Sequence, residues 1–231
     1  LGDSEDKVMG SYAFTGCTSL KAIDIPMKDA DKIGASAFEG CTKLTEVTLK
    51  EGIQYISSAL FKGCAAEAEN GMTFRVKGDS TSNILPKSVQ VIRSNAFQEA
   101  KLDKIDLTNC DKMTEIENYG FALAAIAEIK LPENLKKLDD YAFQGAVLTS
   151  IDIPSNCTEW GASVFSQSSL TKISLPKTLE VIPQRSFRQC QFLMGDNIQI
   201  EDGSNLETIG ENAFEGCILL ANTNFLKGLT K

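Results

Sequence analysis

A short unit that recurs along the whole chain constrains its fold more than any other feature. Nine of the twelve Phe residues share one setting, and their spacings are 24, 23, 36, 24, 22, 22, 22 and 27 residues. Five positions before each of these marker Phe residues stands an apolar side chain. A period of 22–24 residues lies in the leucine-rich-repeat range and is too short for helix-pair repeats. The pattern therefore predicts stacked coils. The markers are Phe14, Phe38, Phe61, Phe97, Phe121, Phe143, Phe165, Phe187 and Phe214.

Between successive markers lies a short segment in which apolar and polar residues alternate. Alternation with period two predicts a short strand with one buried face, and no segment has the capped periodicity of a long helix. We therefore predict a leucine-rich-repeat solenoid, a right-handed superhelix with one parallel β-sheet, short turns or 3-10 segments elsewhere, and little α-helix. Residues 1–231 would form a single domain of about nine coils. The predicted strands are 23–25, 47–49, 105–107, 129–131, 151–153, 173–175 and 198–200.

One coil is longer than the others. Phe61 and Phe97 are 36 residues apart, which expands the coil near residues 64–86. In one register, 72–76 is the strand and 77–83 an outward loop; in the other, the strand lies next to Pro86, and both registers stay open. Long loops in compact scaffolds are often functional. We take Arg75, Lys77, Asp79 and Asn83 as candidate protein contacts of this coil. Both chain ends fall within a repeat, with 224–226 as a final uncovered strand, so the chain is expected to be part of a longer protein.

The outward face of the predicted sheet is the second candidate surface. Asp106, Lys130 and Asp152 represent it among the candidate binding residues. Binding hot spots favour Trp, Tyr and Arg, and neither outward row contains one, so a binding surface and a simple solvated face are equally open. The first row is Asp24, Thr48, Asp106, Lys130, Asp152, Ser174 and Gln199. The second is Ala22, Glu46, Lys104, Glu128, Ser150, Lys172 and Asn197.

Composition excludes several classes of function. The chain has no His and a formal charge of −8, which disfavours His-based nucleophilic catalysis and binding to a nucleic-acid backbone. No apolar run reaches the ~18–20 residues of a membrane span, so no membrane insertion is expected. We predict no enzymatic activity and no cofactor.

The cysteines and two further features favour structural roles. Five of the seven Cys residues stand three positions after a marker, where other coils carry Ala or Ser, so we predict small buried slots with free thiols. No CxxC spacing occurs, which disfavours a zinc site. We interpret the acidic stretch 195–203 as a polar loop around a strand rather than a calcium loop, and Trp160 as a core residue. The five cysteines that stand three positions after a marker are Cys17, Cys41, Cys64, Cys190 and Cys217.

The unit Ile209-Gly-Glu-Asn-Ala-Phe-Glu-Gly-Cys217, echoed at 33–41 and 9–17, resembles the BspA-like leucine-rich repeat. The resemblance covers essentially the whole chain. It implies a secreted or surface-anchored bacterial protein that acts in adhesion, with no catalytic motif. We therefore expect a non-enzymatic extracellular or cell-surface recognition module that binds a host or microbial protein. The alternative is a structural spacer within a larger surface protein.

Overall fold

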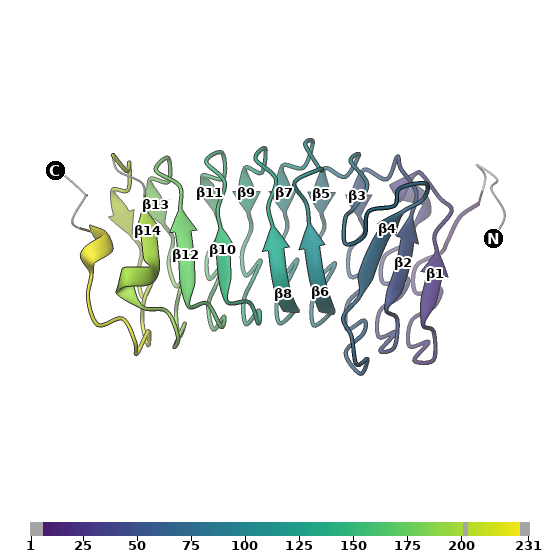
Figure 1. Cartoon of the computed structure of the whole chain (residues 1–231), viewed down its shortest axis with the longest axis horizontal. Helices are drawn as coiled ribbons and strands as arrows, with labels where there is room; N and C mark the ends of the chain where they lie inside the picture. Colours follow the sequence, from purple (N-terminus) through teal and green to yellow (C-terminus); the bar gives the residue numbers. More distant parts are fainter. Residues whose placement is uncertain (1–6, 201–202, 227–231) are drawn as a thin grey trace.

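The computed structural model describes residues 7–200 and 203–226 as an elongated parallel solenoid (Figure 1). The front face holds a row of strands, and those that pair are parallel in the predicted register; Ile23, for example, pairs with Val47 and Ile151 with Ile173. This confirms the predicted solenoid. The front strands are β1 (Ala22–Asp24), β2 (Glu46–Leu49), β4 (Thr73–Val76), β6 (Lys101–Asp106), β8 (Ala125–Lys130), β10 (Ser150–Asp152), β12 (Lys172–Leu175) and β14 (Ile198–Ile200). The row, called the front sheet below, pairs in three groups, β1-β2-β4, β6-β8 and β10-β12-β14, which isolated bridges connect.

A second series of parallel strands lies behind the first (Figure 1). The sequence predicts turns in these segments, because a strand of two residues is too short for alternation to be visible. The back strands are β3 (Tyr55–Ile56), β5 (Val91–Ile92), β7 (Glu115–Ile116), β9 (Lys137–Leu138), β11 (Glu159–Trp160), β13 (Val181–Ile182) and β15 (Thr208–Ile209). The second member of each pair belongs to the apolar column five positions before the marker Phe; it is buried in all but β11 and β15, where Trp160 is half-buried and Ile209 is exposed.

The back series is interrupted between β11 and β13. In neighbouring coils the residue after the second member donates its N–H to the preceding coil: Asp139 N to Ile116 O at 2.9 Å, and Gly161 N to Leu138 O at 2.8 Å. Pro183 occupies the same position and has no N–H to donate. Five strands, β3 to β11, therefore form one sheet, and β13 pairs only with β15.

Helical structure in the described residues is confined to three short 3-10 segments: η1 (Ala30–Lys32), η2 (Gly195–Asn197) and η3 (Asn224–Leu226). The prediction of a final strand at 224–226 is therefore wrong. Asn222 caps this turn by accepting the N–H of Asn224 at 3.0 Å, and Leu226 N donates to Thr223 O at 2.9 Å, so local bonds replace strand pairing. No helix in the described residues has the length and hydropathy to cross a membrane.

The marker Phe residues form a continuous stack through the core. Successive ring centroids lie 5.0–5.9 Å apart with interplanar angles of 5–16°. The seven inner rings are fully buried, whereas Phe14 and Phe214 are half-buried because a described coil covers only one side of each. The expanded coil adds Phe74 from β4, which packs edge-on against Phe61 and Phe97 with centroids 5.4 and 5.7 Å away. The stack therefore continues across the irregular coil.

The turn that leads into each marker has a fixed backbone. The residue two positions before the marker has a φ of 52–63° in all nine coils, a conformation that costs an L-residue ~1–2 kcal/mol. Hydrogen bonds between coils offset this cost: Tyr141 N donates to Ala162 O at 2.9 Å, and Ser163 N donates to Gln184 O at 3.0 Å. The side chains at this position therefore stand in a regular row on the surface. The row is Tyr12, Ser36, Ala59, Asn95, Tyr119, Tyr141, Ser163, Arg185 and Asn212.

Candidate functional site

The front sheet presents the outward rows that the alternation predicts. Asp106 is in register with Lys130, and Asp152 with Ser174. Arg75 belongs to the same row, because it lies on β4 directly opposite Thr48. The expectation that these rows contain no Arg is therefore wrong. The reason is that the expanded coil hid the register of its strand.

Most charges on this face are paired with a neighbour. Lys130 Nζ lies 3.4 Å from Asp106 Oδ2 and 3.7 Å from Glu128 Oε1, and Ser174 donates to Asp152 Oδ1 at 2.6 Å. Partial burial raises the pKa of Asp106, but hydrogen bonds from Thr108 and the proximity of Lys130 outweigh it and lower that pKa overall. Exposed pairs contribute ~0–1 kcal/mol each, so a partner could replace them at little cost.

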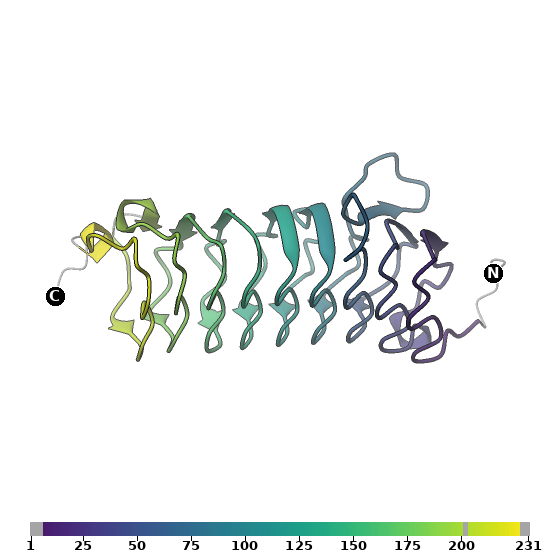
Figure 2. The same ribbon diagram turned by 90° about the horizontal axis from the view of Figure 1, so that it is seen from below.

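The expanded coil combines both registers that the sequence left open. Strand β4 pairs with β2 along its length, which confirms 72–76 as the strand. The chain then projects from the solenoid (Figure 2) and returns between β4 and β6. Asn83 N donates to Phe74 O at 2.6 Å, and Asp106 N donates to Asn83 O at 2.8 Å. The segment beside Pro86 therefore also reaches the sheet, as a single bridge from Ile84 to Asp106.

The candidate residues of the expanded coil differ in their burial and in the ion pairs and hydrogen bonds that they make. Lys77 Nζ lies 3.4 Å from Asp24 Oδ2. Asp79 is exposed and accepts the N–H of Thr81 at 2.8 Å, and this backbone hydrogen bond lowers its pKa. Asn83 is half-buried with a φ of 63°, and its buried amide oxygen has no hydrogen-bond partner among the described residues.

Arg75 is the least constrained cation here. It is exposed, and its guanidinium makes neither an ion pair nor a hydrogen bond within the described chain. The structure thus brings Arg75, Asn83 and Asp106 together at the base of the loop, with Lys130 beyond. Asp152 lies farther along the solenoid on β10, and Asp79 lies within the loop.

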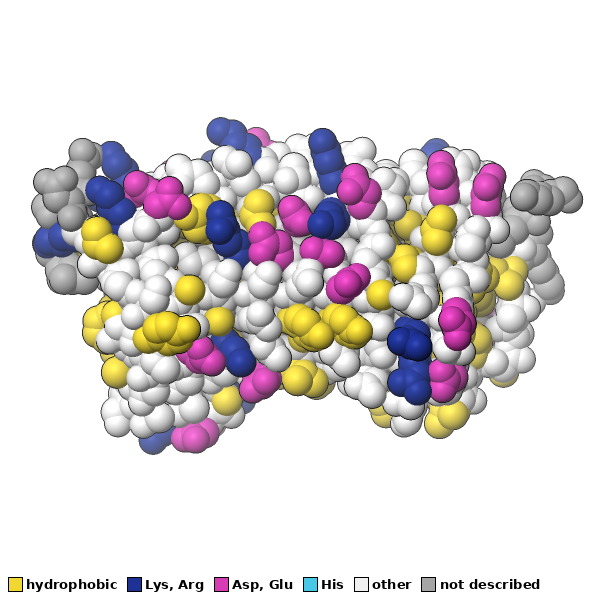
Figure 3. All heavy atoms as spheres, turned by 180° about the vertical axis from the view of Figure 1, so that it is seen from behind, with side chains coloured by type: hydrophobic (Ala, Val, Ile, Leu, Met, Phe, Trp, Pro, Cys, Tyr) yellow, Lys and Arg dark blue, Asp and Glu magenta, His cyan; other side chains and the backbone are white. Residues whose placement is uncertain are grey.

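Charged side chains also gather over the back strands, in a band across the upper part of the rear face (Figure 3). Lys137 Nζ lies 2.8 Å from Glu115 Oε1 and 3.2 Å from Asp139 Oδ2. Tyr55 donates to Asp31, and its ring lies 3.7 Å below the guanidinium carbon of Arg93. Burial and this hydrogen bond raise the pKa of Tyr55 to about 12. Sequence reasoning missed these residues because the two-residue strands gave no alternation signal.

The cysteines form a structural column. All seven are free, and a repeated bond links four of them to the marker Phe of the preceding coil: Cys41, Cys64, Cys190 and Cys217 donate to the carbonyl oxygens of Phe14, Phe38, Phe165 and Phe187 at 3.0–3.1 Å. Burial raises the pKa of all four thiols, so little reactive thiolate forms at neutral pH. The prediction of burial is wrong for Cys17, which is exposed because no described coil precedes it.

Metal-binding groups do not gather in the described part of the chain: no three Asp, Glu, Cys or His side chains are placed to hold an ion. Within the acidic stretch 195–203, Ile198 and Ile200 belong to β14, as the strand interpretation requires, and residues 201–202 lie outside the described residues. Trp160 packs edge-on against Phe165 and Phe187, and its ring N–H donates to Cys157 O at 3.2 Å. It is half-buried and contributes to the core.

The fold and these surfaces define a repeat scaffold with an extended sheet face and a projecting loop. The family model for the BspA type leucine rich repeat region matches residues 7–70, 69–194 and 196–231 in six copies. The chain belongs to this family. Repeats of this class form protein-interaction modules and are typically non-enzymatic.

Several solved structures resemble the chain. A leucine-rich repeat protein of T. pallidum is 18% identical, with a TM-score of 0.41, over 96% of this chain and 77% of that one. A leucine-rich cell surface protein of Faecalibacterium prausnitzii is 19% identical, with a TM-score of 0.45, over 93% and 69%. The pneumococcal vaccine antigen PcpA is 15% identical, with a TM-score of 0.44, over 89% and 67%. No curated protein matches the chain.

Proposed function

We propose that the chain is a non-enzymatic extracellular or cell-surface recognition module that binds a protein partner through the junction of the front sheet and the projecting loop. The observation that carries this proposal is Arg75, an exposed guanidinium without a partner at the base of the loop. Arg is enriched among the residues that dominate protein–protein binding energy. The extracellular location is carried over from the family resemblance.

The geometry of the junction supports a protein partner rather than a small ligand. The front strands lie side by side along the solenoid and form a long face (Figure 1). Solenoids use such faces to contact extended protein surfaces. The loop projects beside this face, and Lys77, Asp106 and Lys130 supply charges of both signs. A partner with an acidic group opposite Arg75 would therefore bind in one orientation.

The test begins with a panel of purified matrix and cell-surface proteins, which are screened for saturable binding to the chain. Arg75→Gln should weaken binding by at least tenfold, and a loop shortened by replacing residues 78–81 with two Gly should weaken it as well. Both variants should keep the thermal midpoint, since residue 75 is exposed and Lys77, Ser82 and Asn83 keep their backbone bonds to the sheet.

The competing function, a spacer, makes a different prediction. A spacer shows no saturable binding to any protein in the panel, and that result would contradict recognition. If a partner binds, and binding survives both junction variants but fails when Lys130 and Asp152 are reversed in charge, the sheet face alone is the site. That outcome would overturn the role proposed for Arg75 and the loop.

A further inference from the structure

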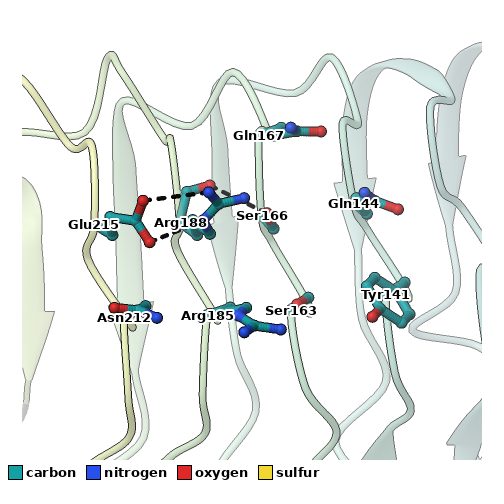
Figure 4. A pocket seen from close by; sticks show the side chains of 9 residues that line it. All are labelled: Tyr141, Gln144, Ser163, Ser166, Gln167, Arg185, Arg188, Asn212 and Glu215. Atoms are coloured by element: carbon teal, nitrogen blue, oxygen red, sulfur yellow. Dashed lines mark hydrogen bonds and ion pairs between the residues drawn. The ribbon is translucent and has the colours of Figure 1, made fainter.

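A polar hollow lies on the turn segments, away from the front sheet, and spans four successive coils (Figure 4). It arises because the coil of Phe165 carries two small residues where the coils on either side carry large ones. Ser163 lies between Tyr141 and Arg185 in the row two positions before the markers, and Ser166 precedes Arg188 in the row one position after them. The hollow has a volume of about 300 Å³, at the small end of the ~300–1,000 Å³ of ligand pockets.

Both walls of the hollow are held in place. On one side, Tyr141 stacks on Tyr119 with centroids 4.8 Å apart and an interplanar angle of 3°. On the other, Glu215 accepts two bonds from Arg188, Nε to Oε2 at 3.0 Å and Nη2 to Oε1 at 3.2 Å. The hydrogen bond from Arg188 lowers the pKa of Glu215, so the pair is fully charged at neutral pH. The walls therefore need little ordering on binding, which favours affinity.

Two side chains in the hollow make no hydrogen bond or ion pair within the described chain, although Arg185 is near enough to Glu215 to help lower the pKa of that carboxyl. Ser163 is 4% exposed, and its hydroxyl makes no hydrogen bond there. The guanidinium of Arg185 makes no ion pair or hydrogen bond either, and Figure 4 shows it extending over the floor toward Ser163, with Tyr141 beyond. Since Glu215 already neutralises Arg188, the hollow keeps one uncompensated positive charge on a chain whose formal charge is −8.

We propose that this hollow binds a single sugar ring that carries a carboxylate. The planar guanidinium of Arg185 matches a carboxylate in a bidentate arrangement. The face of Tyr141 offers an apolar surface to the C–H groups of a pyranose, and the hydroxyl of Ser163 and the amide of Gln144 can bond ring hydroxyls.

A side chain of a protein partner fits this hollow less well. An acidic side chain can offer only its carboxylate to Arg185, whereas an acidic sugar ring can also bond the polar groups of Ser163 and Gln144 through its hydroxyls. The hollow is also separate from the front sheet, so this site does not depend on the recognition function proposed above.

The experiment measures binding of four sugars to the whole chain by NMR titration or calorimetry. The probes are methyl glucuronide against methyl glucoside, and sialyllactose against lactose, so that each acidic sugar has a neutral match. We expect saturable binding of at least one acidic sugar and at least tenfold weaker binding of its neutral match. Acetate and a Glu-containing peptide serve as carboxylates without a sugar ring, and they should bind at least tenfold more weakly than the acidic sugar.

The variants locate the site. Arg185→Gln should weaken binding of the acidic sugar at least tenfold with an unchanged thermal midpoint, because residue 185 is exposed. Arg75→Gln is the matched control, an exposed and unpaired Arg on the front sheet, and should leave sugar binding unchanged. The proposal is overturned if neither acidic sugar binds, if the neutral sugars, acetate or the peptide bind equally well, or if both variants behave alike.

Discussion

At the scale of single residues, the marker stack makes the clearest energetic prediction. Phe143 is fully buried between Phe121 and Phe165, with ring centroids 5.3 and 5.5 Å away. Phe143→Ala should lower the free energy of unfolding by ~3–5 kcal/mol, through lost burial and the cavity that remains. Phe192 is 54% exposed, and Phe192→Ala should change it by less than ~0.5 kcal/mol. Denaturant unfolding measures both, and equal effects would show that the stack is not the core.

The cysteine column predicts a labelling pattern. Only Cys17 is exposed among the seven free cysteines. A maleimide reagent should therefore label one site in the native protein and seven after unfolding, as counted by mass spectrometry. Rapid native labelling of several sites, or a mass that is lower by two hydrogens for each pair, would contradict buried free thiols.

The same column predicts a loss of stability at alkaline pH. Burial raises the pKa of Cys110, Cys157 and Cys190 to about 12, against ~8.5 for a free thiol. The unfolded chain therefore loses these protons first as the pH rises. This stabilising contribution is complete below pH ~8.5 and is lost between there and ~12. The thermal midpoint should fall across that range. The midpoint should fall less steeply in Cys190→Ala, because this variant lacks one of the buried thiols. Other coils carry Ala at the same repeat position, so the substitution is expected to fit.

At the scale of elements, close backbone contact between the first two coils makes Gly34 hard to replace, although later coils carry larger residues at the same repeat position. Gly34 and Gly10 occupy the same repeat position, after Ile33 and Met9. A Cβ at Gly34 would lie 2.2 Å from Ser11 N, whereas at Gly10 nothing lies within 4 Å. Gly34→Ala should therefore lower stability by ~1–3 kcal/mol, as overpacking does, and Gly10→Ala should have little effect. Similar thermal midpoints for the two variants would contradict backbone contact between coils.

Pro183 shows how one residue sets the limit of an element. The octapeptides at 85–92 and 175–182 are nearly identical. The strand that ends the first, β5, pairs with β3 and β7, whereas the strand that ends the second, β13, pairs only with β15. The next residue makes the difference, because Arg93 donates its N–H to Ile56 O at 3.1 Å and a Pro cannot donate. Local sequence thus determines which neighbouring coils pair, even though packing columns determine the coil itself.

At the scale of the whole molecule, the spacing of Phe and the alternation of Ile and Leu were enough to predict the solenoid and the front strands. They were not enough for the back strands, which have two residues each, or for the returning segment at Asn83, whose pairing is with Phe74 and Asp106 rather than with its own neighbours. The polar hollow also escaped prediction. It depends on Ser163 and Ser166 standing between larger residues of adjacent coils, and this becomes visible only once the coils are aligned in space.

The central claim is that every coil is held by the coils on either side of it through two series of parallel strands, and native-state hydrogen exchange tests it most directly. Amides that donate between coils, such as those of Glu117, Asp139 and Gly161, should be strongly protected. Protection should recur with the repeat and decline toward the terminal coils. The amide of Val181 should exchange quickly despite its interior coil, because no hydrogen bond joins β11 to β13. Protection confined to one segment, or equally strong at Val181 and Asp139, would contradict the account.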